Sequence, residues 1–191
     1  IKSPTTDLIS SLYLEEFRNN TVGGSGANEY NVASGATASI LSAVKTAAGP
    51  MAFTNNIFKD NMYKSNHIRI SSENMTITDN SITNNYDDTS AETILATGGL
   101  ISPYLTTAGT GTAMYIKLKD ANAVMTGNTI TGHKGNILGA ALYIEATAAL
   151  TNKIVIDQEN IISDNHAIGS GAKGAALYHV NGIVILGSET A

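Results

Sequence analysis

The fold is decided by two short phrases, Thr126-Gly-Asn-Thr-Ile130 and Gly139-Ala-Ala-Leu-Tyr-Ile144. The first phrase occurs five times in one frame, and each copy has an apolar residue two positions after a central Asn. The intervals between these asparagines are 36, 24, 48 and 32 residues. The asparagines are Asn20, Asn56, Asn80, Asn128 and Asn160. A unit of 24 residues, doubled once and lengthened elsewhere by loops, explains the series.

The second phrase recurs between copies of the first. It is found at Gly111-Thr-Ala-Met-Tyr-Ile116 and Gly174-Ala-Ala-Leu-Tyr-His179 as well as at Gly139. Segments such as Met75-Thr-Ile-Thr78 and Lys153-Ile-Val-Ile156 alternate apolar and polar residues, which indicates β-strands. Two kinds of strand that alternate in a fixed order therefore indicate a coiled chain, in which each coil returns to the position where the previous one began.

Repeated strands without intervening helices are compatible with an antiparallel sandwich or a parallel β-helix. Only stacked coils place equivalent residues directly above one another, so the recurring Asn favours the helix. We predict a right-handed parallel β-helix of about six or seven coils. It forms one segment, 1–191, of a longer chain, with an insertion near 86–110 where the repeat is lost. Each central Asn is expected in the left-handed conformation at a corner, with its amide bonded to the Asn of the next coil.

Composition excludes several function classes. The chain has 191 residues, of which 42% are hydrophobic and 14% charged, with a net charge of -5 and no Cys. The acidic balance argues against nucleic-acid binding, and the absence of Cys excludes disulfides, thiolate metal sites and cysteine nucleophiles. No apolar run reaches the roughly 18 residues of a membrane-spanning helix.

Candidate catalytic groups are scattered. Asp60 and Asp164 share a register but lie in different coils, which favours a turn-forming role. Adjacent carboxylates on a strand point to opposite faces, so Glu15-Glu16 and Asp87-Asp88 are weak acid pairs. The four histidines, His67, His133, His166 and His179, lack metal-site spacing. We therefore predict no catalytic residue, no metal and no cofactor.

One column of tyrosines is expected on the surface. Tyr115, Tyr143 and Tyr178 share a register in the second phrase. Because the more apolar Leu142 and Ile144 flank Tyr143, we expect the apolar pair inside and the tyrosines outside, as a ladder for a sugar chain or another partner.

Three copies of Phe-x-x-Asn, at Phe17-Arg-Asn-Asn20, Phe53-Thr-Asn-Asn56 and Phe58-Lys-Asp-Asn61, suggest a family. With the Gly-Ala-Ala-Leu phrases, they resemble the repeats of the chlamydial polymorphic membrane proteins, which are autotransporter adhesins. The resemblance implies a β-helical passenger on the outer membrane, or secreted, that attaches bacteria to host-cell receptors in virulence. It also implies binding roles for the motif residues: Phe17, Asn20, Phe53, Asn56, Phe58, Asn61, Gly139, Ala140, Ala141, Leu142, Gly174, Ala175, Ala176 and Leu177.

The expected function is a non-enzymatic adhesin or scaffold that contacts a protein receptor or glycan on a cell surface. One alternative is a carbohydrate-active β-helix enzyme, with His67 and Arg69 on one face near Asp60. Another is a subunit of an extracellular filament that associates end to end.

Overall fold

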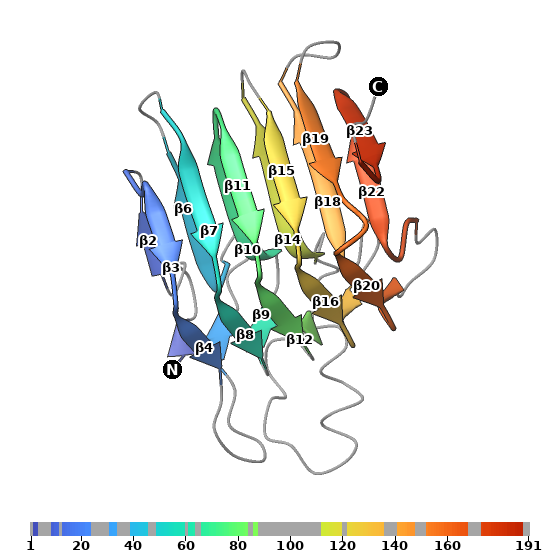
Figure 1. Ribbon diagram of the computed structural model, residues 1–191. Helices are drawn as coiled ribbons and strands as arrows, with labels where there is room; N and C mark the ends of the chain where they lie inside the picture. The colour runs from blue at the N-terminus through green and yellow to red at the C-terminus, as the bar shows by residue number, and fades with distance from the viewer. Residues whose placement is uncertain are drawn as a thin grey trace.

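The chain folds into a right-handed parallel β-helix of about six coils, as the repeats predict (Figure 1). The computed structural model describes residues 2–3, 9–11, 13–23, 31–33, 39–45, 49–59, 61–63, 66–83, 86–87, 112–119, 122–135, 141–147, 152–167 and 173–188. Every regular element in these ranges is a β-strand. The strands of successive coils lie side by side from the N-terminal end to the C-terminal end.

Four parallel sheets, which we call A, B, C and D, run along the helix. From β2 onward, successive strands of the chain belong to sheets B, C, D and A in turn. Sheet B consists of β2 (Ile9–Ser11), β6 (Leu41–Val44), β10 (Asn66–Ser72), β14 (Thr112–Leu118), β18 (Leu142–Ala146) and β22 (Leu177–Val180). Sheet C consists of β3 (Glu16–Arg18), β7 (Met51–Thr54), β11 (Met75–Thr78), β15 (Ala123–Thr126), β19 (Lys153–Ile156) and β23 (Ile183–Leu186).

The other two sheets have shorter strands. Sheet D consists of β4 (Thr21–Gly23), β8 (Ile57–Lys59), β12 (Ser81–Thr83), β16 (Thr129–Thr131) and β20 (Ile161–Ser163). Sheet A consists of β1 (Lys2–Ser3), β5 (Asn31–Ala33), β9 (Asn61–Tyr63), β13 (Tyr86–Asp87), β17 (Lys134–Gly135) and β21 (His166–Ala167).

A full coil thus holds four strands where the two phrases predict two. The reason is that the Asn phrase itself contains a corner: Thr126 ends β15 and Thr129 begins β16. The short strands of sheet A then complete the coil. Of the predicted insertion near 86–110, β13 is described, and the remainder lies outside the described residues.

Inward columns of apolar residues form the core. In sheet C, parallel pairing aligns Phe17, Phe53, Ile77, Met125 and Ile156, and all but Phe17 are buried. In sheet D, pairing aligns Val22, Phe58, Ile82, Ile130 and Ile162. Each column buries one large apolar side chain per coil, and this repeated burial stabilises the stack.

The central asparagines form a continuous polar ladder between these columns. The Asn56 amide nitrogen Nδ2 donates to Asn80 Oδ1 at 2.9 Å, and Asn80 Nδ2 donates to Asn128 Oδ1 at 2.9 Å. The same asparagines also donate to backbone carbonyls one coil back, as Asn80 Nδ2 does to Phe53 O at 2.8 Å. Asn20 and Asn160 form the two ends of the ladder. The expected side-chain bonding is therefore confirmed, and it satisfies amides that are almost completely buried.

The expected left-handed conformation of these asparagines is wrong by one residue. Positive φ angles belong to the preceding residues: Asn19 at 57°, Asn55 at 52°, Asp79 at 55° and Gly127 at 65°. The backbone turns there, so the following Asn points inward and can reach the next coil. The left-handed turn and the inward amide thus belong to two adjacent residues, whereas a single Asn was expected to supply both.

The small residues of the second phrase lie at or just before the start of the sheet B strands. Ala113 and Ala141 are fully buried one residue ahead of Met114 and Leu142. Ile40 and His67 occupy the equivalent position in earlier coils and are also fully buried. Alanine thus occupies this position in the coils of β14 and β18, whereas the earlier coils of β6 and β10 have larger side chains there.

Candidate functional site

The three tyrosines of the second phrase lie in one column on the outer face of sheet B. Parallel pairing aligns Tyr115, Tyr143 and Tyr178. Tyr143 is half-buried between fully buried Leu142 and Ile144, so its ring points away from the core. Ring centroids are 5.3 Å apart for Tyr115 and Tyr143 and 5.4 Å apart for Tyr143 and Tyr178. The rings are therefore in contact along the helix axis.

Arg69 extends this column by one coil. It pairs with Tyr115 in the register of β10 and β14, and its Cζ atom lies 5.8 Å from the Tyr115 ring centroid. That position over a ring face is a cation–π contact. The result, which we call the Arg–Tyr column, consists of Arg69, Tyr115, Tyr143 and Tyr178.

A second outward column beside it carries opposite charges. Glu145 accepts a hydrogen bond from the Tyr115 hydroxyl at 2.7 Å and lies 3.2 Å from Lys117 Nζ. The Tyr115 hydrogen bond, followed by the Lys117 charge, lowers the pKa of Glu145 and keeps it ionised. Burial, and then the bond to Glu145, raise the pKa of Tyr115, so its hydroxyl stays protonated.

The Phe-x-x-Asn residues lie mainly in the interior. Phe53, Phe58, Asn56 and Asn61 are fully buried, whereas Phe17, at the N-terminal end of its column, is partly exposed. The three Phe rings contact one another, with Phe17 and Phe53 stacked at 5.6 Å. These residues hold successive coils together, so a partner would meet the outward residues between them.

The Gly-Ala-Ala-Leu residues divide between core and surface. Ala141 and Leu142 are fully buried, and Gly139 and Ala140 lie outside the described residues. Gly174, Ala175 and Ala176 are exposed, and Leu177 is partly buried against the core. Gly174 has a φ of 64°, and a Cβ there would lie 2.1 Å from Leu177 O, so this position requires glycine.

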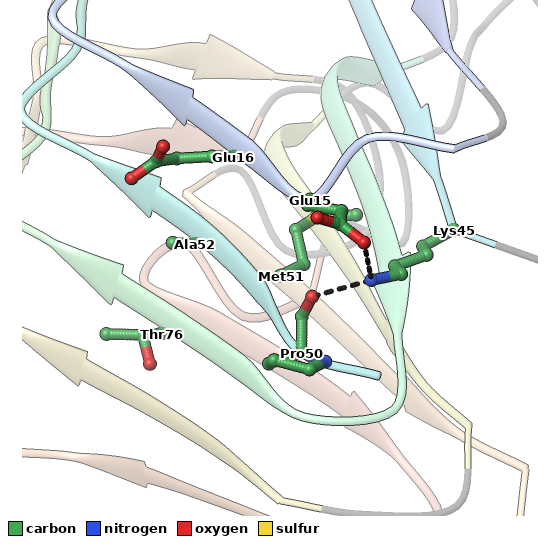
Figure 2. Close-up of a pocket in the computed structure, with 7 residues that line it drawn as sticks. All are labelled: Glu15, Glu16, Lys45, Pro50, Met51, Ala52 and Thr76. Carbon is green, nitrogen blue, oxygen red and sulfur yellow. Dashed lines mark hydrogen bonds and ion pairs between the residues drawn. The ribbon is translucent and has the colours of Figure 1, made fainter. Parts of the chain in front are cut away.

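A pocket of about 350 Å³ lies at the corner from sheet B to sheet C. Its lining consists of Glu15, Glu16, Lys45, Pro50, Met51, Ala52 and Thr76 (Figure 2). Lys45 is 3% exposed; its Nζ donates to Pro50 O at 2.9 Å and lies 3.5 Å from Glu15 Oε1. The buried Lys45 ammonium therefore links Pro50 to Glu15 of the preceding coil, so its charge has a structural role.

Glu15 and Glu16 correct one expectation from the sequence. Both line the same pocket, because Glu15 belongs to the bend before β3 and strand alternation does not apply to it. Their carboxylates nevertheless diverge: Glu15 points to Lys45, while Glu16 points away from them both and pairs with Arg18 at 3.0 Å. The two groups do not converge as an acid and base acting on one bond would have to.

The residues of the alternative enzyme site are separated. His67 is fully buried near the start of β10, edge-on to Phe58 at 5.4 Å, whereas Arg69 lies on the outer face. Asp60 lies outside the described residues. Burial lowers the pKa of His67 well below its usual value, and it lowers that of His133 to about 3, so both imidazoles are neutral at physiological pH.

Other site types find little support in the described ranges. No group of three or more His, Asp or Glu side chains there could hold a metal ion. Asp164 adopts a φ of 54°, in line with the expected turn-forming role. Among the same residues, no helix is long and apolar enough to cross a bilayer.

Sequence reasoning did not place Arg69, Lys117 and Glu145 beside the tyrosines. A signal for Arg69 was present: Ile68-Arg-Ile70 has the aliphatic, outward, aliphatic order of Met114-Tyr-Ile116. That equivalence is concealed in the sequence because His67 stands in place of Ala113, so the Gly-x-Ala lead of the second phrase is missing. The Lys117–Glu145 pair depends on cross-strand contact and has no local signal.

Comparisons with protein-family models, with curated proteins and with solved structures found no match to this chain. The fold is therefore established by its own geometry alone.

Proposed function

We propose that this chain is a non-enzymatic binding segment, an adhesin or extended scaffold of the cell surface or the extracellular space. The observation that carries the proposal is the Arg–Tyr column, an ordered row of half-buried side chains on the outside of a rigid helix. Tyrosine and arginine are enriched among the residues that dominate binding energy at protein interfaces. Three coils of sheet B hold the tyrosine rings in register, so little side-chain freedom would be lost on binding.

The dispersal of ionisable groups supports binding over catalysis. Within the described residues, His67 and His133 are buried and neutral, and the Glu15 and Glu16 carboxylates diverge. The repeat phrases add support, because they resemble those of the chlamydial polymorphic membrane proteins. A receptor on a host cell, either protein or glycan, is the partner that this resemblance suggests.

Adhesion can be measured with beads that carry the purified chain and with cultured animal cells. We expect Tyr143→Ala to reduce bead attachment several-fold, and Tyr13→Ala to leave it unchanged. Tyr13 is a matched control because its side chain is 75% exposed and lies outside the Arg–Tyr column. Equal attachment by the wild type and Tyr143→Ala would contradict the proposal.

The enzyme alternative has its own test. The purified chain would be incubated with pectin and other acidic and neutral polysaccharides, and new chain ends would be counted. Cleavage that disappears in Asp60→Ala would overturn the binding proposal, and we expect no cleavage.

A further inference from the structure

The Arg–Tyr column has unsatisfied hydrogen-bond donors along its length. Within the described residues, the Arg69 guanidinium contacts the Tyr115 ring and acts on the Glu145 charge at longer range, without a hydrogen-bond or ion-pair partner. The Tyr143 and Tyr178 hydroxyls have no hydrogen-bond partner among the same residues. The Tyr115 hydroxyl, by contrast, is committed to Glu145. Burial, followed by the negative charge of Glu145, raises the pKa of Tyr143, which keeps that hydroxyl a donor.

The charge of this face is opposite to that of the whole chain. Arg69 and Lys117 contribute two positive charges and Glu145 one negative charge, whereas the chain has a net charge of -5. Lys117 and Glu145 neutralise each other at 3.2 Å, so the unpaired charge of the face is the Arg69 guanidinium. A planar guanidinium with open donors is suited to a carboxylate, which it can bind with two parallel hydrogen bonds.

The ring geometry argues against a sugar chain. Tyr143 has Tyr115 on one side and Tyr178 on the other, with interplanar angles of 32° and 39°. Arg69 lies over the Tyr115 ring. The ring faces between Arg69 and Tyr178 are thus covered by neighbours, and a pyranose would find edges and hydroxyls instead of open faces for stacking.

We infer that the Arg–Tyr column binds an extended, acidic segment of a partner protein, laid along the helix axis. The inference rests on the proposed binding function and names the partner's chemistry. A carboxylate of the segment pairs with Arg69, while its carbonyl oxygens or a second carboxylate accept hydrogen bonds from the Tyr143 and Tyr178 hydroxyls. Three coil spacings of about 4.8 Å correspond to about five residues of extended peptide.

The test is fluorescence polarisation with a labelled peptide that alternates Glu and Thr. A matched probe has Gln in place of every Glu, and a third probe is a labelled sulfated polysaccharide. We expect the Glu peptide to bind, its affinity to fall as salt increases, and the Gln peptide to bind at least ten-fold more weakly.

Single substitutions test whether the Glu peptide binds at the Arg–Tyr column. Arg69→Gln is expected to weaken Glu-peptide binding about ten-fold, the loss of one charge-assisted contact. Tyr143→Phe and Tyr178→Phe retain the rings, remove the hydroxyls and are expected to weaken binding about three-fold each. Arg18→Gln and Tyr13→Phe are the matched controls, because Arg18 lies on sheet C and Tyr13 outside both columns.

Equal binding of the Glu and Gln peptides, or no binding of either, would overturn the inference. So would an Arg18→Gln effect as large as that of Arg69→Gln, or a preference for the polysaccharide that depends on Arg69. If Tyr143→Ala still reduces cell attachment while the Glu peptide does not bind, the acidic partner is wrong and the binding function stands. If neither is observed, both proposals fail.

Discussion

Phenylalanine side chains pack inside the first coils of the helix, whereas a column of tyrosines lies outside the later ones. Phe17, Phe53 and Phe58 pack against one another in the interior of the early coils. Tyr115 and Tyr143 instead stack on the outer face of sheet B in the later coils, where no Phe or Tyr among the described residues is fully buried. The same repeat thus uses aromatic rings for two purposes. An inward ring fills volume in the core, whereas an outward ring is not needed to complete the coil and is available to a partner.

The largest difference between the two regions is expected in stability. Phe53 is fully buried, so Phe53→Ala should lower the free energy of unfolding by about 4 kcal/mol through lost burial and a cavity. Tyr143→Ala should lower it by only about 1 kcal/mol, because a half-buried ring loses less contact. Urea denaturation monitored by circular dichroism measures both. Equal losses would show that the outer column is as structural as the core.

Acid should lower the free energy of unfolding through the buried histidines of the interior. The folded-state pKa of His133 is about 3 because of burial, and its unfolded value is near 6.5. The unfolded chain therefore binds the proton first, and stability is lost as the pH falls below about 6.5. Between pH 7.5 and 4.5 the expected loss from His133 is about 3 kcal/mol.

A repeat-guided variant isolates this effect. Asn165, in the next coil, accepts a hydrogen bond from His133 N, and Asn is recurrent at this position. His133→Asn should therefore reduce the dependence of unfolding free energy on pH in this range, while His67, whose pKa is also lowered, maintains part of it. An unchanged pH dependence would contradict the assignment.

The asparagine ladder allows a buried polar side chain to be compared with a partly exposed one. Asn80→Ala removes the acceptor of the Asn56 amide and the donors to Asn128 Oδ1 and Phe53 O. Because the backbone N–H and an Nδ2–H of Asn56, which both donate to Asn80 Oδ1, then lose their acceptor inside the protein, the expected loss is about 3 kcal/mol. Asn20→Ala, at the partly exposed end of the ladder, should cost about 1 kcal/mol. Thermal or urea unfolding of the two variants checks the ratio.

The smallest effect is expected for an exchange within one core column. Ile77 and Met125 occupy in later coils the position of Phe53, so the column itself tolerates different apolar shapes. Phe53→Met should lower the unfolding free energy by about 1 kcal/mol, far less than Phe53→Ala. A loss as large as that of the alanine variant would mean that the stacked rings, rather than volume alone, hold the early coils together.

Several features of the fold could be predicted from local repeats. The spacing of Asn56 and Asn80, each followed two positions later by an apolar residue, indicated the coil and the ladder, because stacking repeats a local environment at each level. The outward direction of Tyr143 followed from the apolar neighbours Leu142 and Ile144. The candidate site was less predictable: the register that joins Arg69 to Tyr115 and the ion pair of Lys117 with Glu145 connect coils tens of residues apart.

The sequence by itself determined the architecture, since a phrase repeated in frame can satisfy its Asn amides and bury its apolar residues only by stacking on itself. Tertiary structure alone decided the corners. There, the left-handed residue is Asn55 and not Asn56, His67 lies in the core, and Glu15 and Glu16 line one pocket. Alternation governs side-chain direction only while the backbone stays extended, and at a corner the direction depends on which coil lies above and below.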